Sequence, residues 1–443
     1  MLIMNTFRLL PLSLALFGAL ALPAQAQSLV DLYESAREFD ASFQAAKSQF
    51  DATVFKGEQA RAALLPSVNL AMGMSRTHVS SDTANFDRGG FGNQSATLTA
   101  SQPLFRPANQ ATAEQGERQK LLAQAQLNAA EQDLIIRVSQ SYFDVLASGD
   151  SLNFVKAQKT AVAEQLASAK RNFEVGTATI TDTREAQARF DLVLAQEIAA
   201  ENDLRVKRIA LDQLTGKSGT TPRLLATPVA ITAVTPDDVT RWVSQSEDAH
   251  PSIRQAQLAL ELAQLETKKA KAANLPTLDL TGSYNVTLNN GTASSQLDYR
   301  SNVAGIGLSF NLPLFAGYAI QNRIKETLAL EDKARSDLDT SKRGVAQATR
   351  VAFFGVQSGL GQVKALEAAE TSSQSALDAN KLGYQVGVRI NIDVLNSQSQ
   401  LYDTKAKLAK ARYDVLVGGL RLRQANGTLK AEDIQVVNSL LMN

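Results

Sequence analysis

The chain has 443 residues, enough for two or three ordinary domains. Its 45 lysines and arginines nearly balance its 44 aspartates and glutamates, and the formal net charge of +1 argues against a broad basic footprint for nucleic acid or a strongly acidic partner surface. Cysteine is absent, which excludes a thiol nucleophile, a disulfide, a thiolate metal site and a Cys-linked lipid anchor. The two histidines, His78 and His250, are too few for a multi-histidine metal cluster.

The N-terminal residues have the organisation of a secretory signal peptide. Arg8 supplies a positive region, residues 9–22 are apolar, and Ala24-Gln25-Ala26 is a small-residue cleavage site. The alternative, a transmembrane anchor, needs about 20 apolar residues, whereas this stretch is shorter and ends at Pro23. We therefore expect residues 1–26 to be removed and the chain to be exported. The mature chain has no other apolar run of about 18 residues, so we expect no hydrophobic membrane helix.

After this segment the sequence predicts one helix and then two strands. Residues 28–64 are rich in helix formers, and Pro66 ends that helix. Apolar and polar residues alternate over about 67–78 and again over about 94–105. Such alternation is typical of transmembrane β-strands, which turn an apolar face to lipid and a polar face to a lumen. A half-buried strand of a soluble sandwich alternates in the same way, so both interpretations stay open here.

Two long helices follow the strands. Residues 108–174 contain no proline and would form a helix of roughly 100 Å, against an average of about 11 residues for helices in globular proteins. Apolar residues recur there in heptads, which predicts a left-handed coiled coil. One heptad position holds Val138, Val145, Leu152, Leu166 and Phe173, and the other holds Leu134, Val155, Val162 and Ala169. A turn near Gly176 leads into a return helix over about 182–214.

The second half of the chain repeats the first at a shift of about 210 residues. Leu65-Pro66-Ser67-Val68 matches Leu275-Pro276-Thr277-Leu278, and Phe173-Glu174-Val175-Gly176 matches Tyr384-Gln385-Val386-Gly387. We interpret residues 27–237 and 238–443 as two structural repeats. The second repeat has strands over about 277–289 and 302–314 and a hairpin tip near Gly387. A duplication without structural consequence is the alternative, but the matching landmarks lie at predicted structural boundaries.

No constellation of residues predicts catalysis or a cofactor. Thr215-Gly216-Lys217-Ser218 resembles the second half of a phosphate-binding loop, but Leu211 stands where the first glycine is required and no strand precedes it. His78 and His250 are interpreted as ordinary surface or core residues. The acidic residues of the helices are expected to be solvated and paired at i,i+4 spacing. We therefore expect neither an enzyme nor a cofactor.

The predicted strands are too few to form a membrane structure alone. Each repeat offers two strands, and a sheet with open edges is not stable in lipid. The smallest single-chain outer-membrane barrels have about eight strands, so a barrel would require strands from several chains. Three copies would pool about 12 strands and as many long helices around an open centre, which predicts a tube.

Several segments resemble the TolC family of outer-membrane efflux and secretion channels, in its non-lipoprotein branch. They are Gln102-Pro103-Leu104-Phe105, Asn311-Leu312-Pro313-Leu314-Phe315-Ala316-Gly317, the segment from Asn172 to Gly176 with Ile180-Thr181-Asp182, and Tyr384-Gln385-Val386-Gly387 with Arg389 and Asp393-Val394-Leu395. The resemblance implies an α+β membrane fold: a homotrimer with a 12-stranded β-barrel in the outer membrane of a Gram-negative bacterium, a periplasmic barrel of coiled-coil helical hairpins, and an equatorial girdle.

The resemblance also implies a function and partners. The protein would be the passive exit duct of a tripartite export system for drugs, small molecules or type I secreted proteins. Its partners would be a periplasmic adaptor and an inner-membrane ABC or proton-driven transporter. The alternative is a periplasmic coiled-coil scaffold or adaptor that forms no channel, which would require the alternating strands to be soluble.

The same resemblance assigns roles to residues near the two tips, Gly176 and Gly387. It implies that Asp182, Tyr384 and Arg389 form the bonds that hold the periplasmic entrance shut.

The resemblance further implies a constriction lined by carboxylates. Members of the family usually carry two carboxylates three residues apart just past the second tip, where this chain has Asp393 and Asn396. In the repeat register, position 396 corresponds to Glu185. We expect Glu185 to replace the missing carboxylate; the alternative is that Glu185 points outward on a solvated helix face.

Overall fold

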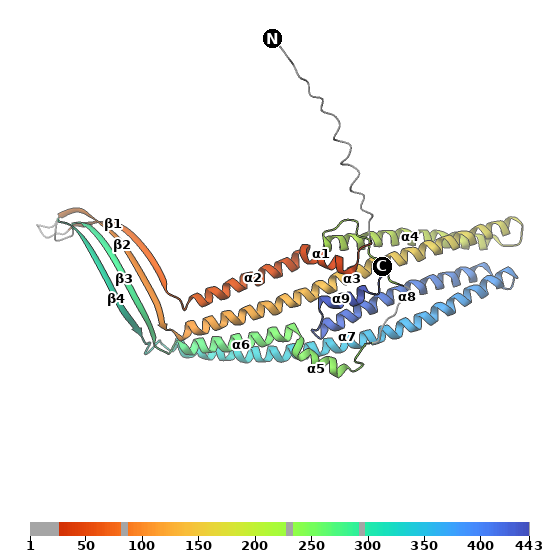
Figure 1. Ribbon diagram of the computed structural model, residues 1–443. Coiled ribbons are helices and arrows are strands. Elements are labelled where there is room, and N and C mark those ends of the chain that lie inside the picture. Colours follow the sequence, from red (N-terminus) through yellow and green to blue (C-terminus); the bar gives the residue numbers. More distant parts are fainter. Residues whose placement is uncertain (1–25, 81–86, 227–233, 292–296, 443) are drawn as a thin grey trace, which may run out of the picture. The chain divides into compact units, whose positions relative to one another are not determined.

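The computed structural model describes residues 26–80, 87–226, 234–291 and 297–442 (Figure 1). The predicted signal peptide lies outside these residues, apart from Ala26. The chain divides into two compact units, of which unit 1 comprises Met1–Gln44, Glu131–Trp242 and Thr349–Asn443, and unit 2 comprises Ala45–Ala130 and Val243–Ala348. Each unit therefore contains segments from both predicted repeats.

Helices make up unit 1 and much of unit 2, and the strands lie in unit 2 (Figure 1). In chain order, the elements are α1 (Leu29–Phe39), α2 (Ala41–Ala62), β1 (Ser67–Ser80), β2 (Asp87–Phe105), α3 (Pro107–Glu174), α4 (Ile180–Thr215), α5 (Val239–Ala249), α6 (Pro251–Ala272), β3 (Thr277–Asn290), β4 (Asp298–Asn311), α7 (Ala319–Gln385), α8 (Asn391–Ala425) and α9 (Ala431–Asn438).

The strands of the described chain form one antiparallel sheet in the order β1-β2-β3-β4. All four predicted strands are present, but the limits of two strands, β2 and β4, differ from the prediction by several residues. β2 begins at Asp87 instead of about residue 94, because its backbone continues to pair with β1 as far as Ser80. β4 covers Asp298–Asn311 instead of about 302–314. Backbone pairing extends these strands through polar residues that alternation alone does not identify.

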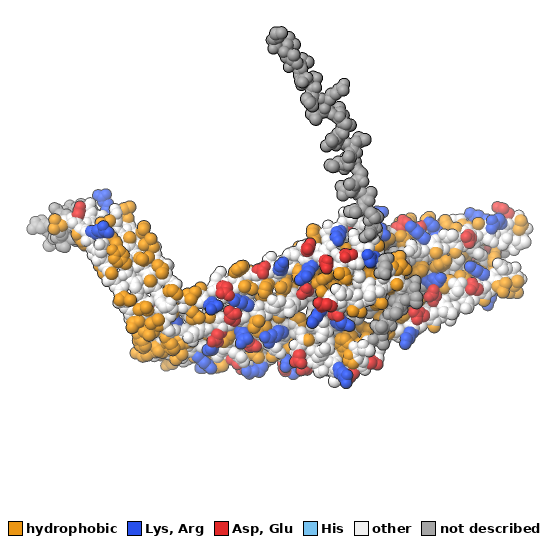
Figure 2. All heavy atoms as spheres, in the orientation of Figure 1, with side chains coloured by type: hydrophobic (Ala, Val, Ile, Leu, Met, Phe, Trp, Pro, Cys, Tyr) orange, Lys and Arg blue, Asp and Glu red, His pale blue; other side chains and the backbone are white. Residues whose placement is uncertain are grey.

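The two faces of the sheet differ in polarity, as the alternation predicted. Even-numbered positions form an apolar face, on which large side chains are exposed in the single chain: Val68, Leu70, Met72, Met74, Leu98, Tyr284, Leu288, Ile306, Leu308 and Phe310. Figure 2 shows hydrophobic side chains gathered over the strands. Odd-numbered positions carry mostly serine, threonine, asparagine and glycine. Between the register shifts at Thr77/Val79 and Pro103/Phe105, residues paired across the strands have the same parity, for example Ser67 with Ser101, so each face is continuous there.

The helix predicted over 28–64 is wrong in one respect, because it breaks at Asp40 into α1 and α2. The Asp40 carboxylate accepts hydrogen bonds from the Phe43 backbone N–H (2.8 Å) and the Ser42 hydroxyl (2.5 Å). The guanidinium of Arg137 binds both Asp40 oxygens at 2.9 and 3.0 Å, and these bonds hold the pKa of Asp40 well below its usual range. The side chain therefore caps the start of α2.

A second break separates α5 from α6 at His250, which is 250 − 40 = 210 residues after Asp40. The His250 Nδ1 atom accepts a hydrogen bond of 3.1 Å from the Ser252 backbone N–H, and Pro251 occupies the first helical position. Burial lowers the pKa of His250. This histidine thus has a capping role.

Most of the predicted heptad positions of α3 are buried, with Val155 partly buried. In unit 1, Val138, Val145, Leu152 and Leu166 are buried, whereas Phe173 at the end of the helix is 44% exposed. Val162, Leu166 and Ala169 of α3 pack against Ala186 and Val193 of α4 and Leu395 of α8. These clusters join α3 to its return helix and to the second hairpin (Figure 1). Among the residues described, no helix is both long and apolar enough to cross a membrane.

The tips of the two hairpins have the same backbone turn. Gly176 and Gly387 have positive φ angles of 79° and 80°. At the first tip, the Gly176 N–H donates to the Phe173 carbonyl (3.0 Å) and the Thr177 N–H to the Asn172 carbonyl (2.8 Å); the second tip repeats this pattern. These are the bonds of a Schellman motif, which favours glycine in the left-handed region.

We predict that Gly176→Ala and Gly387→Ala each lower the free energy of unfolding by about 1 kcal/mol, because a Cβ atom disfavours a positive φ. No atom lies within 4 Å of the Cβ position at either glycine, so strain and not a clash causes the loss. Gly149→Ala in the middle of α3 is the control and should raise stability by about 0.8 kcal/mol. Denaturant unfolding of the purified protein measures all three, and equal effects at Gly149 and the tips would contradict the prediction.

Candidate functional site at the hairpin tips

The structure places the predicted gate and constriction residues in unit 1, on the two hairpins. Asp182 and Glu185 lie in the first turns of α4, Tyr384 lies at the end of α7, and Asp393 and Asn396 begin α8. Arg389 lies in the turn between α7 and α8. α4 packs against α8, so the first hairpin meets the second within one chain.

Tyr384 connects the second hairpin to the first. Its half-buried ring packs against Leu377, Val394 and Leu401. Its hydroxyl accepts a hydrogen bond of 3.2 Å from the side-chain amide of Asn172 at the end of α3. Sequence reasoning noted Asn172 only as part of the tip segment, and a partner 212 residues away gives no local signal.

The Asp182 side chain hydrogen-bonds to Thr179, the residue that caps the start of α4. Its Oδ2 accepts hydrogen bonds from the Thr179 backbone N–H (2.9 Å) and the Thr179 hydroxyl (2.7 Å), and the Asp182 N–H donates to Thr179 Oγ1 (3.2 Å). This is a capping box, whose Thr-x-x-Asp spacing was readable from the sequence. Within the described part of one chain, no bond joins Asp182 to Tyr384 or Arg389.

Arg389 and Asp393, predicted as gate and constriction residues, lie next to each other. The Arg389 Nη1 atom is 3.6 Å from Asp393 Oδ2, at i,i+4 spacing. The Arg389 side chain is 59% exposed, so this ion pair contributes only about 0–1 kcal/mol. Its guanidinium therefore keeps most of its donors available to another partner.

Asn396 binds an arginine that the sequence did not single out. Its Oδ1 atom accepts a hydrogen bond of 2.7 Å from Arg189 Nη2 on α4. Glu185 lies one turn before Arg189 and is half-buried. The Glu185 carboxylate makes no side-chain hydrogen bond or ion pair with the residues that the structure describes. Arg189 thus introduces a positive charge beside Asn396.

Further hydrogen bonds between uncharged groups continue along the contact between α3 and α8. Gln165 binds Asn391, and Gln158 Nε2 donates to Ser399 Oγ at 3.1 Å. The α3 members Asn172, Gln165 and Gln158 are one heptad apart, so they lie on the same stripe of the helix. We call these bonds, with those of Tyr384 and Asn396, the hairpin seam.

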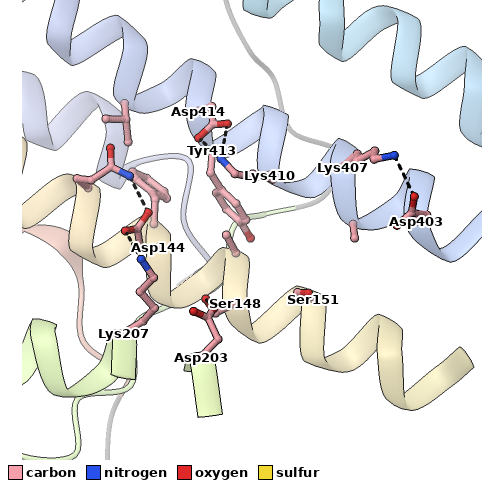
Figure 3. A pocket seen from close by; sticks show the side chains of 15 residues that line it. Asp144, Ser148, Ser151, Asp203, Lys207, Asp403, Lys407, Lys410, Tyr413 and Asp414 are labelled. Carbon is pink, nitrogen blue, oxygen red and sulfur yellow. Dashed lines mark hydrogen bonds and ion pairs between the residues drawn. The ribbon is translucent and has the colours of Figure 1, made fainter. Parts of the chain in front are cut away.

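A groove lined by α3, α4 and α8 follows the hairpin seam toward the middle of unit 1 (Figure 3). Its charged side chains pair in the wall: Lys207 with Asp144 at 3.2 Å, Lys407 with Asp403 at 2.9 Å, and Lys410 with Asp414 at 2.8 Å. The Tyr413 hydroxyl donates to Asp150 Oδ2 at 2.7 Å, and burial raises the pKa of both groups. The fourth carboxylate of the lining, Asp203, has no lysine partner there, and its Oδ2 accepts a hydrogen bond of 2.6 Å from the Ser148 hydroxyl.

The structure supports no phosphate or metal site among the described residues. Gly216 of the predicted half-loop is the left-handed C-cap of α4, and its N–H donates to the Asp212 carbonyl at 2.8 Å. No group of three or more histidine, aspartate or glutamate side chains in the described ranges is arranged to hold a metal ion.

Comparison with known proteins identifies relatives over nearly the whole chain. The sequence model of the family described as "Outer membrane efflux protein" matches residues 32–217 and 242–428. The outer membrane protein TolC of Vibrio cholerae is 33% identical over 434 residues, which cover 98% of each chain. The proteases secretion protein PrtF of Dickeya chrysanthemi is 30% identical, with 93% of this chain and 90% of the relative covered.

Solved structures share the fold. A structure of CusC aligns with a TM-score of 0.78 at 18% identity and covers 91% of this chain and 92% of that chain. The outer membrane protein VceC of Vibrio cholerae aligns with a TM-score of 0.77 at 19% identity and covers 90% and 96%, respectively.

The Arg189–Asn396 bond predicts the effect of restoring a carboxylate. Asn396→Asp should strengthen the bond to Arg189 by about 0.5 kcal/mol, because it turns a hydrogen bond between a guanidinium and a neutral amide into an exposed ion pair, and such pairs contribute about 0–1 kcal/mol. A double-mutant cycle with Arg189→Gln, measured by unfolding, gives the coupling. Gln400→Glu, which adds a charge to an exposed position of α8, is the control. If the coupling energy between positions 189 and 396 is close to zero, Arg189 does not face residue 396 in solution.

Proposed function

Because the chain belongs to the outer membrane efflux protein family, we propose that it forms the passive exit duct of a tripartite export system. The observation that carries the proposal is the match to this family in two segments, residues 32–217 and 242–428. The family consists of transport channels and not of enzymes. The sheet with one apolar and one polar face suits a wall between lipid and a lumen.

The proposed channel is a homotrimer. The sheet of one chain ends at β1 and β4, whose outer backbone groups have no partner strand among the described residues. Pairing β1 of one copy with β4 of the next would close three sheets into a 12-stranded barrel in the outer membrane. The helical hairpins of three chains would form the periplasmic barrel.

Partners and cargo follow from the relatives by analogy. PrtF and the alkaline protease secretion protein AprF of Pseudomonas aeruginosa are named for protease secretion, and BepC of Brucella suis is named an outer membrane efflux protein. We propose the same classes here: drugs and small molecules, or type I secreted proteins. A periplasmic adaptor and an inner-membrane ABC or proton-driven transporter would complete the system. Cleavage after Ala26 would release the mature chain into the periplasm of a Gram-negative bacterium.

We also propose that residues 27–237 and 238–443 are structural repeats. The helix breaks at Asp40 and His250 support this partition, as do the matching turns at Gly176 and Gly387. The two segments matched by one family model begin 242 − 32 = 210 residues apart.

A periplasmic scaffold without a channel is the alternative to the duct. It would leave the apolar face of the sheet exposed to water, including Ile306, Leu308 and Phe310. Extraction separates the two functions: the duct requires detergent to leave the outer membrane and runs as a heat-modifiable trimer, whereas release by salt or a pH change would identify a scaffold.

The proposed gate consists of Tyr384, Arg389 and Asp182. Tyr384 holds the second hairpin against Asn172 of the first, and Arg389 is exposed where a neighbouring subunit would pass. Asp182, whose Oδ2 already binds Thr179, keeps lone pairs for a contact with an adjacent chain. In a trimer with three-fold symmetry, each of these weak bonds would occur three times, and together they would form a ring around the entrance.

Loss of the proposed gate bonds should open the entrance. The double variant Tyr384→Phe with Arg389→Ser should raise the single-channel conductance in planar bilayers several-fold and increase antibiotic leakage into cells. The matched control is Tyr402→Phe with Arg343→Ser, which removes the same groups from the bodies of α8 and α7. A double variant with parental conductance would contradict the gate assignment.

The proposed constriction contains Asp393, Glu185 and Asn396. Asp393 alone would give a trimer three carboxylates, and Glu185 would raise this to six. The Arg389 and Arg189 guanidinium groups lie beside these positions and would reduce the field that the carboxylates produce. The proposed constriction attracts cations because the Asp393 and Glu185 carboxylates face the lumen while the two guanidinium groups lie to their side.

Glu185→Gln tests the orientation of Glu185 without altering the Asp182 cap. The variant should lower the cation selectivity of the closed channel and weaken block by a trivalent cation added from the periplasmic side. Glu201→Gln is the control, because Glu201 lies farther along α4 in an ion pair with Lys156 at 3.1 Å. If Glu185→Gln behaves like Glu201→Gln, Glu185 lies on the outer face.

A further inference from the structure

The polar face of the sheet is nearly free of charge. Among the strand side chains that the structure describes, the odd-numbered positions carry serine, threonine, asparagine, glycine, a few apolar residues and Tyr299, and Asp279 is the one aspartate, glutamate, lysine or arginine. The charged residues Arg76, Asp298 and Arg300 occupy even-numbered positions at the loop end of the sheet. Among these described side chains, the polar face therefore carries no formal charge other than that of Asp279.

Hydrogen bonds between neutral side chains cross this face. Asn93 Nδ2 donates to Asn289 Oδ1 at 2.6 Å, and Thr97 Oγ1 donates to Asn285 Oδ1 at 2.9 Å. These pairs join β2 of the first half of the chain to β3 of the second half. These side chains satisfy one another's hydrogen-bonding groups, so this part of the face presents hydroxyl and amide groups without formal charge.

The carboxylate of Asp279, the one aspartate or glutamate at a described odd-numbered strand position, is neutralised where the sheet meets the helices. Arg106, between β2 and α3, binds Asp279 through two bonds, Nε to Oδ1 at 2.7 Å and Nη2 to Oδ2 at 2.6 Å. The Asp279 side chain is 9% exposed, and that of Arg106 is 43% exposed. The fork geometry fixes both groups, so the carboxylate is covered by the guanidinium that cancels its charge.

We propose that the strand-built part of the duct is a charge-neutral wall that does not select cargo by charge, and that the Arg106–Asp279 pair keeps it neutral. This inference rests on the proposed duct, in which the odd-numbered face lines the lumen. A lumen ringed by one sign of charge concentrates ions of the other sign and holds them. A neutral hydroxyl and amide wall instead lets segments of either charge pass, which suits a cargo of polypeptides or of mixed small molecules.

A single introduced thiol reports the local potential, because the chain has no cysteine. Ser309 pairs with Asp279 in the β3–β4 register, so Ser309→Cys places the thiol on the polar face beside the charge pair. Leu308→Cys is the matched control on the apolar face. Trimers in lipid vesicles at low salt are treated with a cationic and an anionic membrane-impermeant methanethiosulfonate. The ratio of the two reaction rates is compared with the ratio for a free small thiol.

We expect Ser309→Cys to react with a rate ratio within about twofold of the free thiol. Adding Asp279→Asn leaves Arg106 unpaired and should shift the ratio about fivefold toward the anionic reagent. Adding Arg106→Gln should shift it by a similar factor toward the cationic reagent. The variant with both changes should return to the parental ratio. The two single substitutions shift the rate ratio in opposite directions. If one of the two variants fails to form trimers, the other still tests whether the Arg106–Asp279 pair keeps the wall neutral.

The outcomes separate this inference from the proposed duct. If Leu308→Cys and Ser309→Cys react alike, the sheet does not divide lipid from a lumen, and the duct and the neutral wall both fail. If only Ser309→Cys reacts but its parental ratio is strongly biased, or Asp279→Asn and Arg106→Gln leave the ratio unchanged, the duct stands and the neutral wall is wrong.

Discussion

The two open edges of the sheet are the constraint on which the rest of the structure depends. A four-stranded sheet with an apolar face leaves the outer backbone groups of β1 and β4 without strand partners in the chain. In the proposed duct, lipid supplies no hydrogen bonds to these groups, so they would pair with strands of other copies. Pooling the strands in this way would bring the helices that precede β1 and β3 and follow β2 and β4 into a ring. The proposed tube is then a consequence of strand pairing at the membrane end.

The hairpins combine strong packing with a weakly bonded seam. Apolar clusters join α3 to α4 through Val162, Leu166 and Val193, and burial of such residues contributes about 1.5–3 kcal/mol each. Between the two hairpins, Leu395 of α8 is the one buried residue of the second hairpin in this cluster. The hairpin seam consists largely of hydrogen bonds such as Asn172–Tyr384 and Gln158–Ser399, worth about 0.5–1.5 kcal/mol each. Separation at the seam would therefore cost less than unpacking a hairpin. A gate made of rigid hairpins that move apart follows from this difference.

Periodic features were predictable from the sequence, and contacts between distant residues were not. The period of two located the strands and their faces, and the heptads located buried residues such as Val138 and Leu166, because each pattern repeats one local geometry. The break at Asp40 was missed because it depends on Arg137, which lies 97 residues away. The Arg189–Asn396 bond was missed for the same reason. The capping role of Asp182 was available from Thr179-x-x-Asp182 and was overlooked in favour of a gate role.

The specific polar bonds do not follow the proposed repeat. In that register Arg106 corresponds to Ala316 (106 + 210 = 316), and Asp279 corresponds to Asn69 (279 − 210 = 69). Likewise, Arg189 corresponds to Gln400 (189 + 211 = 400), and Asn396 corresponds to Glu185. The turns and helix breaks occur in both halves, whereas Arg106–Asp279 and Arg189–Asn396 each occur once and join one half to the other.

Backbone geometry thus preserves an approximate six-fold arrangement in the proposed trimer, and these charged groups reduce it to three-fold. Two hairpins that are alike in fold but differently bonded need not move together. A ring of six alternating hairpins could then open by displacing one set of three against the other, because the two hairpins of a chain contribute different residues to the hairpin seam.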